Sequence, residues 1–161
     1  MIRSASLIAV FLVVGGSASA APEKAAVFDF QFSNLSPVPS DTADTARLKR
    51  VSAQLRDLLQ KRGLFTVVSV DPVRDEVAKS ADLRRCNGCA DELARKLGAD
   101  VAITGEVQKV SNLILNLNVY VKSLRGPAPE RAYSVDLRGD TDESFDRGIR
   151  FLVENNMGAG K

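Results

Sequence analysis

Hydrophobic and polar positions change their period along this chain, and the changes divide it into alternating strand and helix candidates. Residues 25–32 and 64–70 are short runs of apolar, aromatic and β-branched side chains, a pattern typical of strands. Between these runs, apolar residues recur at helical spacing after Asp41, a favoured N-cap residue, and the stripe stops before Gly63. The pattern predicts a long amphipathic helix that begins at Asp41 and connects two strands.

The rest of the chain predicts further helices and strands. An Asp-Pro pair is typical of a helix start and predicts a short helix over 71–79, while residues 89–97 predict another that Gly98 ends. Thr141 is placed to cap a final helix whose apolar residues share one face. The strands predicted in this part are residues 101–110, 112–122 and 130–139.

The element order is therefore β-α-β-α-α-β-β-β-α. Strands separated by helices are expected to be parallel, and consecutive strands joined by short turns are expected to be antiparallel. We predict one globular domain over residues 21–161, of the α/β class with an α+β mixed sheet. Its five-stranded sheet would have parallel first strands and a C-terminal antiparallel meander, with helices packed on one or both faces.

The meander strands alternate between apolar and polar positions. Such alternation gives an antiparallel sheet one core face and one polar face. The side chains predicted to form a polar binding face are Gln108, Asn116, Asn118, Tyr120, Asp136 and Arg138. Their amides and charges suit a partner or a glycan, whereas a solvated face with cross-strand hydrogen bonds is the simpler interpretation.

The first twenty residues have the pattern of a cleaved signal peptide. Arg3 precedes an apolar run over 7–14, and an A-x-A cleavage pattern ends at Ala20. The run has eight residues, whereas a helix that spans a bilayer needs about 20. We expect cleavage after Ala20, a periplasmic location and no membrane anchor after cleavage, since no cysteine near that point could carry a lipid.

The amino-acid composition limits the kinds of catalytic and binding sites that the chain can form. The chain has no His and no Trp, and its 22 Lys and Arg nearly balance 20 Asp and Glu. Without His, histidine-based triads and histidine metal sites are excluded. A nearly balanced charge does not favour nucleic acid as a partner. We therefore expect no catalytic residue, no metal, no cofactor and no enzymatic activity.

Cys86 and Cys89 form the one motif with chemistry of its own, a C-x-x-C. Arg84, Arg85 and the start of the following helix favour a thiolate, which would make Cys86 the nucleophile in thiol–disulfide exchange. The motif lies far from the preceding strand, however, unlike the motif of thioredoxin-like folds. In an oxidising compartment we expect a structural disulfide, with a redox-active pair as the alternative and a metal-binding or dimer-bridging pair after it.

Asp29 lies within the first predicted strand, between two phenylalanines that point the other way. A carboxylate near the carboxyl end of a parallel strand suits a binding site. We expect a solvent-facing position, or one that accepts backbone hydrogen bonds, because charges are rarely buried without partners.

Several segments resemble known families. The V-F-D-F run at 27–30, the strand at 65–68 and the L-G-A-D turn at 97–100 resemble the N-terminal domain of TolB and the related CsgG-like domains. The C-N-G-C run, with residues 108–115 and 138–144, resembles an uncharacterised family of secreted bacterial proteins, a domain of unknown function. The first resemblance implies an assembly, scaffold or partner-binding module. Ring formation is not carried over, because neither a propeller domain nor a lipidated cysteine is present.

We therefore predict an exported, non-enzymatic accessory protein that binds an envelope or periplasmic protein, or a second copy of itself. One alternative is a thiol–disulfide redox protein that uses Cys86 and Cys89. The other is a small-ligand-binding domain with its site at the carboxyl ends of the parallel strands, which rests on fold analogy.

Overall fold

A single mixed sheet organises the computed structural model, which describes residues 21–80 and 82–158. The predicted signal peptide, residues 1–20, lies outside these ranges. The strands are β1 (Lys24–Val27), β2 (Gln31–Asn34), β3 (Thr66–Val68), β4 (Val101–Lys109), β5 (Leu115–Ser123) and β6 (Arg131–Leu137). The α-helices are α1 (Thr42–Lys61), α2 (Arg74–Lys79), α3 (Cys89–Lys96) and α4 (Asp142–Phe151), with a 3₁₀ turn η1 (Asp71–Val73) before α2 and a π-helical turn η2 (Leu152–Met157) after α4.

The strands lie in the order β3-β1-β4-β5-β6, and β2 also pairs with β4. Strand β1 is parallel to both β3 and β4, and β2 is parallel to β4. Strands β4, β5 and β6 form an antiparallel meander. The predicted fold class, with parallel first strands and a C-terminal meander, is therefore confirmed.

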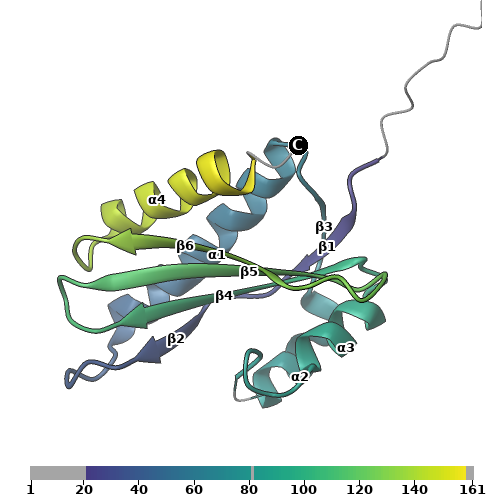
Figure 1. Cartoon of the computed structure of the whole chain (residues 1–161). Helices are drawn as coiled ribbons and strands as arrows, with labels where there is room; N and C mark the ends of the chain where they lie inside the picture. The colour runs from purple at the N-terminus through teal and green to yellow at the C-terminus, as the bar shows by residue number, and fades with distance from the viewer. Residues whose placement is uncertain (1–20, 81, 159–161) are drawn as a thin grey trace, which may run out of the picture.

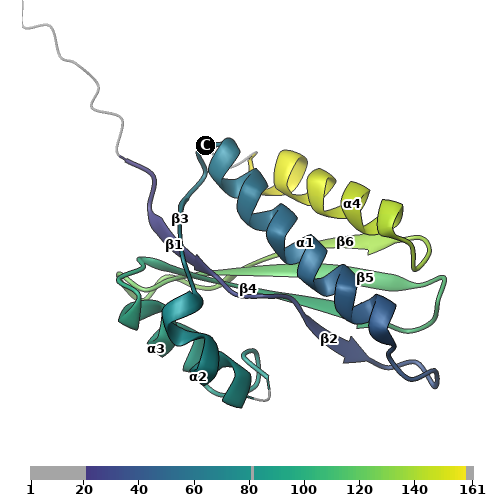
Figure 2. The same cartoon turned by 180° about the vertical axis from the view of Figure 1, so that it is seen from behind.

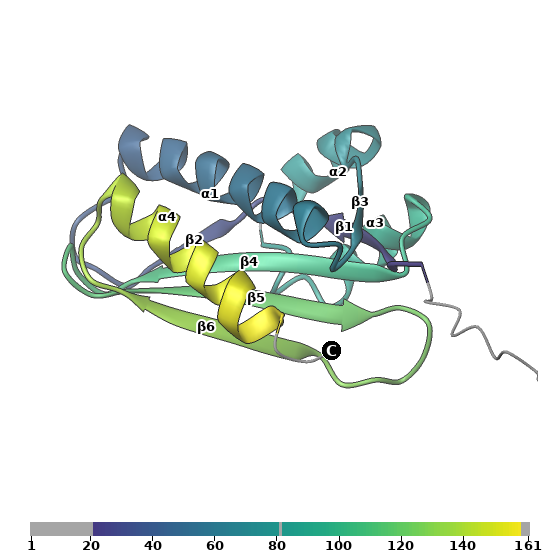
Figure 3. The same ribbon diagram turned by 90° about the horizontal axis from the view of Figure 1, so that it is seen from above.

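Helices cover the two faces of the sheet unequally. Helices α1 and α4 lie side by side over one face, and α2 and α3 lie on the other (Figures 1, 2 and 3). The fully buried side chains of the first layer include Val51, Leu55, Leu59, Ile103, Leu115, Leu117, Ile149 and Leu152. The smaller core beneath α2 and α3 contains Phe28, Val73, Leu83, Leu93 and several alanines. Helices α2 and α3 lie at one end of their face, near β1, β3 and the first residues of β4, and no described helix lies over the other end of the meander on this face (Figure 1).

The sequence predicted one continuous strand over residues 25–32, and this prediction was wrong: the structure has two strands there, β1 and β2. Helix α1 supplies the hydrogen bonds at the interruption. The Arg56 Nε and Nη2 groups donate to the Val27 carbonyl at 3.0 and 2.9 Å, and the Phe30 N–H donates to Ser52 Oγ at 2.9 Å. These side-chain bonds satisfy backbone groups that a continuous strand would pair with its neighbour.

Gly105 of β4 faces the Phe30 ring at the same interruption. A Cβ atom at Gly105 would lie 2.4 Å from Phe30 Cδ1, closer than carbon atoms can approach. Phe30 is 3% exposed, so its ring has little room to move. The glycine therefore lets the ring fill the core at the point where the chain leaves β1.

The helix caps agree with the sequence pattern. Asp41 caps α1, since its Oδ1 accepts from the Asp44 N–H at 2.8 Å, and the Thr141 hydroxyl accepts from the Ser144 N–H at 3.2 Å. The strand predicted over 112–122 was wrong at its start, because β5 begins at Leu115. The Ser111 hydroxyl accepts hydrogen bonds from the Leu113 and Ile114 N–H groups and holds residues 111–114 in a turn before β5.

Candidate functional site

Three of the six residues predicted to form a polar face lie in one row across the meander. Gln108, Asn116 and Asp136 lie opposite one another on β4, β5 and β6, as the register Gln108–Asn116–Asp136 shows. The Asn116 Nδ2 group donates to Asp136 Oδ1 at 2.7 Å, so this amide already has a partner across the strands. Gln108 and Asn116 are half-buried and Asp136 is exposed. We call these three residues the polar row.

Two further members of the predicted face are largely covered. Asn118 is 5% exposed and accepts a hydrogen bond from Ser134. The Arg84 guanidinium lies over the Tyr120 ring at 3.5 Å from its centroid, and it pairs with Glu130 at 2.7 Å. Burial and the negative charge of Glu106 raise the pKa of the Tyr120 phenol, so it stays protonated at neutral pH. Tyr120 is thus held as an aromatic platform for Arg84.

Arg138 lies one residue beyond the end of β6. It lines a hollow of about 260 Å³ with Asp136 of the polar row and with Arg147 and Phe151 of α4. Arg138 therefore lies beside one end of the polar row, although no strand pairing places it in the row itself.

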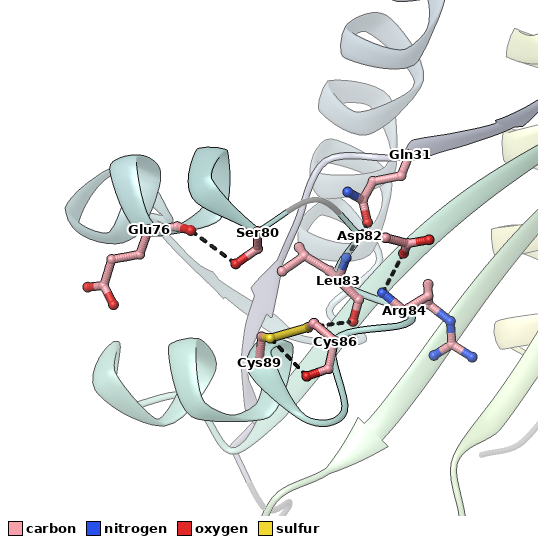
Figure 4. Close-up of a disulfide and its surroundings, with 8 residues drawn as sticks. All are labelled: Gln31, Glu76, Ser80, Asp82, Leu83, Arg84, Cys86 and Cys89. Carbon is pink, nitrogen blue, oxygen red and sulfur yellow. Dashed lines mark hydrogen bonds between the residues drawn. A yellow bond between two sulfur atoms is a disulfide. The ribbon is translucent and has the colours of Figure 1, made fainter.

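Cys86 and Cys89 are joined by a disulfide with a Cα–Cα distance of 5.7 Å (Figure 4). Asn87 and Gly88, both in the left-handed region, turn the chain between them, and α3 begins at Cys89. Both cysteines are half-buried and pack against the small core beneath α2 and α3. The disulfide ties the 82–88 segment to the start of α3, and its use in redox chemistry stays a prediction.

An apolar surface that sequence patterns did not reveal lies at one end of the molecule. We call it the apolar end, and it consists of Leu35, Val38, Val110, Leu113 and Ile114, which are between 49% and 76% exposed. These residues come from the β2–α1 and β4–β5 loops, which lie at the same end of the sheet (Figures 1 and 2). The Leu35 N–H donates to the Lys109 carbonyl at 2.9 Å and joins the two loops.

An ion network lies beneath the apolar end. Lys109 Nζ pairs with Asp140 and lies 3.3 Å from Asp44 Oδ1, and all three side chains are nearly buried. Arg47 adds contacts to Asp140 at 2.8 Å and to Asp142 at 3.0 Å. Burial disfavours the charged form of Lys109 and by itself would lower its pKa. The hydrogen bonds and negative charges of Asp140 and Asp44 outweigh this effect, so the pKa of Lys109 is raised.

This ion network connects three parts of the chain. Lys109 ends β4, Asp44 and Arg47 belong to the first turns of α1, and Asp140 precedes α4. The β4–β5 loop of the apolar end begins after Lys109, and the β2–α1 loop ends at α1. The network therefore joins the two elements that border the loops of the apolar end.

A crevice of about 500 Å³ opens at the carboxyl ends of β1 and β3. Its apolar wall includes Phe28, Val68 and Val77, and Asp29 and Arg56 pair at its rim. Asp29 is exposed, as expected from the sequence, and its partner Arg56 comes from α1. Helices on opposite faces of the sheet flank this crevice, which is where open α/β sheets commonly bind ligands.

In the parts of the chain that the structure describes, no helix is long and apolar enough to cross a membrane. Within the same residues, no group of three or more Cys, Asp or Glu side chains is arranged to hold a metal ion.

The fold is shared with bacterial proteins of known structure. The C-terminal domain of LpoB from Salmonella enterica aligns with a TM-score of 0.55 and 16% identity, over 76% of this chain and 87% of that domain. Lipoprotein GNA1162 from Neisseria meningitidis aligns with a TM-score of 0.51 and 14% identity, over 82% of this chain and 96% of that one. At these identities the likeness shows the fold alone.

The chain is thus a mixed α/β domain of the kind seen in LpoB and in this lipoprotein. Residues 23–157 match the family DUF3280, described as a protein of unknown function (DUF2380), and the chain belongs to this family. The resemblance to a domain family of unknown function is confirmed, whereas the likeness to TolB and CsgG stays a prediction. No curated protein matches the sequence.

Proposed function

We propose that this chain is an exported periplasmic accessory domain without enzymatic activity, and that it binds an envelope protein through the apolar end. The observation that carries the proposal is the gathering of Leu35, Val38, Val110, Leu113 and Ile114 at one end of the molecule. Exposed apolar side chains that gather in one region of a protein surface are a feature of interaction sites.

The polar row extends this surface. Gln108 precedes Lys109 at the end of β4, and Asn116 is the second residue of β5, so the row borders the β4–β5 loop. An apolar centre beside a polar rim is the usual anatomy of a protein interface. The polar row alone is a weaker candidate, because Asn116 and Asp136 already bind each other.

Two observations support an extracytoplasmic location. The first is the Cys86–Cys89 disulfide, since such bonds persist in oxidising compartments. The second is the fold shared with a Neisseria lipoprotein, which supports the location by analogy. The first twenty residues would direct export and be removed after Ala20.

Site-directed photo-crosslinking in living cells tests the proposed surface. A photoreactive amino acid is placed at Leu113 or Val38 in the apolar end, and at Lys61 as an exposed control on the opposite end of α1. We expect one discrete adduct with an envelope protein from both apolar positions and none from Lys61. The adduct should disappear when Ile114 is replaced by Asp, because a charge in an interface core remains unpaired.

A different outcome would contradict the proposal. Equal adducts from Lys61 and Leu113 would mean that the apolar end is not the surface that partners contact. An adduct with twice the mass of the chain would replace the envelope partner by a second copy, and the concentration dependence of the mass in solution would then measure its strength.

A further inference from the structure

The crevice at the carboxyl ends of β1 and β3 has the construction of a small-molecule site, separate from the apolar end. Its volume of about 500 Å³ lies within the range of ligand pockets, about 300–1,000 Å³. Helix α1 forms one wall with Arg56 and Gln60, and η1 with α2 forms the other with Asp71 and Arg74. The strands contribute an apolar floor that includes Phe28, Val68 and Val70.

The rim carries two oppositely charged pairs, one on each wall. Arg56 pairs with Asp29, and Arg74 pairs with Asp71. Arg56 is held firmly, because its two bonds to the Val27 carbonyl fix the guanidinium. Its side chain is 27% exposed, so its charge is only partly screened by water.

Asp71 has two hydrogen-bond partners on the other wall. The Ser69 hydroxyl donates to Asp71 Oδ2 at 3.0 Å, and Arg74 binds the other oxygen. Hydrogen bonds from Arg74 and Ser69 lower the pKa of Asp71, so this carboxylate is charged at any physiological pH. The positive charge of Arg56 makes a further, smaller contribution to lowering the pKa of Asp71.

We propose that this crevice binds a zwitterion with an apolar body, of the class of free amino acids and short peptides. A ligand with a single charge would be attracted by one member of each pair and repelled by the other. A ligand that carries both a carboxylate and an ammonium group can meet an arginine and an aspartate at once, as charge-assisted hydrogen bonds require. The floor of Phe28, Val68 and Val70 then accepts an apolar side chain.

Titration of ¹⁵N-labelled protein by NMR tests this proposal with defined probes. The probes are L-leucine and L-leucyl-L-leucine, with N-acetyl-leucyl-leucine as an anion and leucyl-leucine amide as a cation. We expect saturable shifts of the Val68, Val70 and Asp71 amides with at least one zwitterion. Each singly charged analogue should bind about tenfold more weakly, the value of one charge-assisted hydrogen bond.

Variants separate a local site from a general charge effect. Arg74→Gln and Asp71→Asn lie in an exposed pair, 75% and 68% exposed, so the fold should tolerate either change. Each should weaken zwitterion binding about tenfold. Arg147→Gln is the matched control, because Arg147 also belongs to an exposed arginine–carboxylate pair on a helix, with Glu143.

Three results would overturn the inference. The first is the absence of saturable shifts with either zwitterion up to about 10 mM, beyond the range of weak specific ligands. The second is equal binding of the anion and the zwitterion, which would remove the role of the carboxylates. The third is a loss in Arg147→Gln equal to that in Arg74→Gln. None of these results bears on the apolar end, so the two proposals fail separately.

Discussion

Replacing Lys109 by Met is the sharpest test of the ion network beneath the apolar end. The side chains of Lys109, Asp44 and Asp140 are only 5%, 4% and 11% exposed. Removing one partner of a buried ion pair costs about 3–5 kcal/mol, because the remaining charge stays buried without its partner. Arg47 still lies 2.8 Å from Asp140 and 3.5 Å from Asp44. We therefore expect the lower end of the range, about 3 kcal/mol.

Urea unfolding followed by circular dichroism measures this loss. With an m-value of about 2 kcal/mol/M, a loss of about 3 kcal/mol lowers the unfolding midpoint by about 1.5 M. The same change is then made in an Asp44→Asn background. Asn keeps an oxygen for the capping bond from the Asp41 N–H and loses the charge. The cost of Lys109→Met should fall by about 1 kcal/mol or more in that background, since residues in one network are coupled.

Lys61→Met provides the matched control. Lys61 pairs with Asp57 at 2.9 Å, but its side chain is 73% exposed. Exposed pairs contribute about 1 kcal/mol at most, so the midpoint should hardly move. If Lys109→Met lowered the free energy of unfolding by no more than Lys61→Met, the buried network would be worth no more than an exposed ion pair. That result would refute the argument from burial.

Three further predictions use the same assay or a simple extension of it. Gly105→Ala should cost about 1–3 kcal/mol because its Cβ would overlap the Phe30 ring, and an unchanged midpoint would contradict this packing. Replacing both Cys86 and Cys89 by Ser should lower the free energy of unfolding by about 2 kcal/mol, as expected for so short a loop. In the wild type, a thiol titration measures the reduction potential of the pair: a value below about −300 mV indicates a structural disulfide, and one of about −120 to −230 mV an exchange catalyst. The raised pKa of Lys109 means that its contribution is complete below pH 10.5 and is lost as the pH rises through the folded-state pKa, so the midpoint should fall at alkaline pH in the wild type more than in Lys109→Met.

The local parts of the fold could be predicted from the sequence, because their signals act over a few residues. The caps at Asp41 and Thr141 and the order of helices and strands are of this kind. The division of the first strand is not, because it depends on Arg56 and Ser52, which lie 29 and 22 residues from the groups they bind. No periodicity in the strand itself carries that information.

The surfaces were harder to predict than the elements. Alternation indicated which way Asn116 and Asn118 point, but their partners Asp136 and Ser134 come from another strand and decide whether the amides are free. Leu113 was placed within a strand, and its exposure follows from the turn that delays β5. The Ser111 hydroxyl, which accepts the Leu113 N–H, is the local feature that extends this turn beyond Asn112.

The parallel pairing of β1 with β4 has a consequence for how the chain folds. Ala25 lies opposite Val101, so β1 pairs with a strand that lies 76 residues later in the sequence. The hydrogen bond between Lys24 and Asp100 spans the same separation. The β4–β6 meander, whose contacts are local, can form before this distant pairing. Strand β3 lies at the edge of the sheet and pairs with β1, so it can join the sheet only through β1. We expect the addition of β1, with β3 at its outer edge, to the finished meander to be the last step of folding.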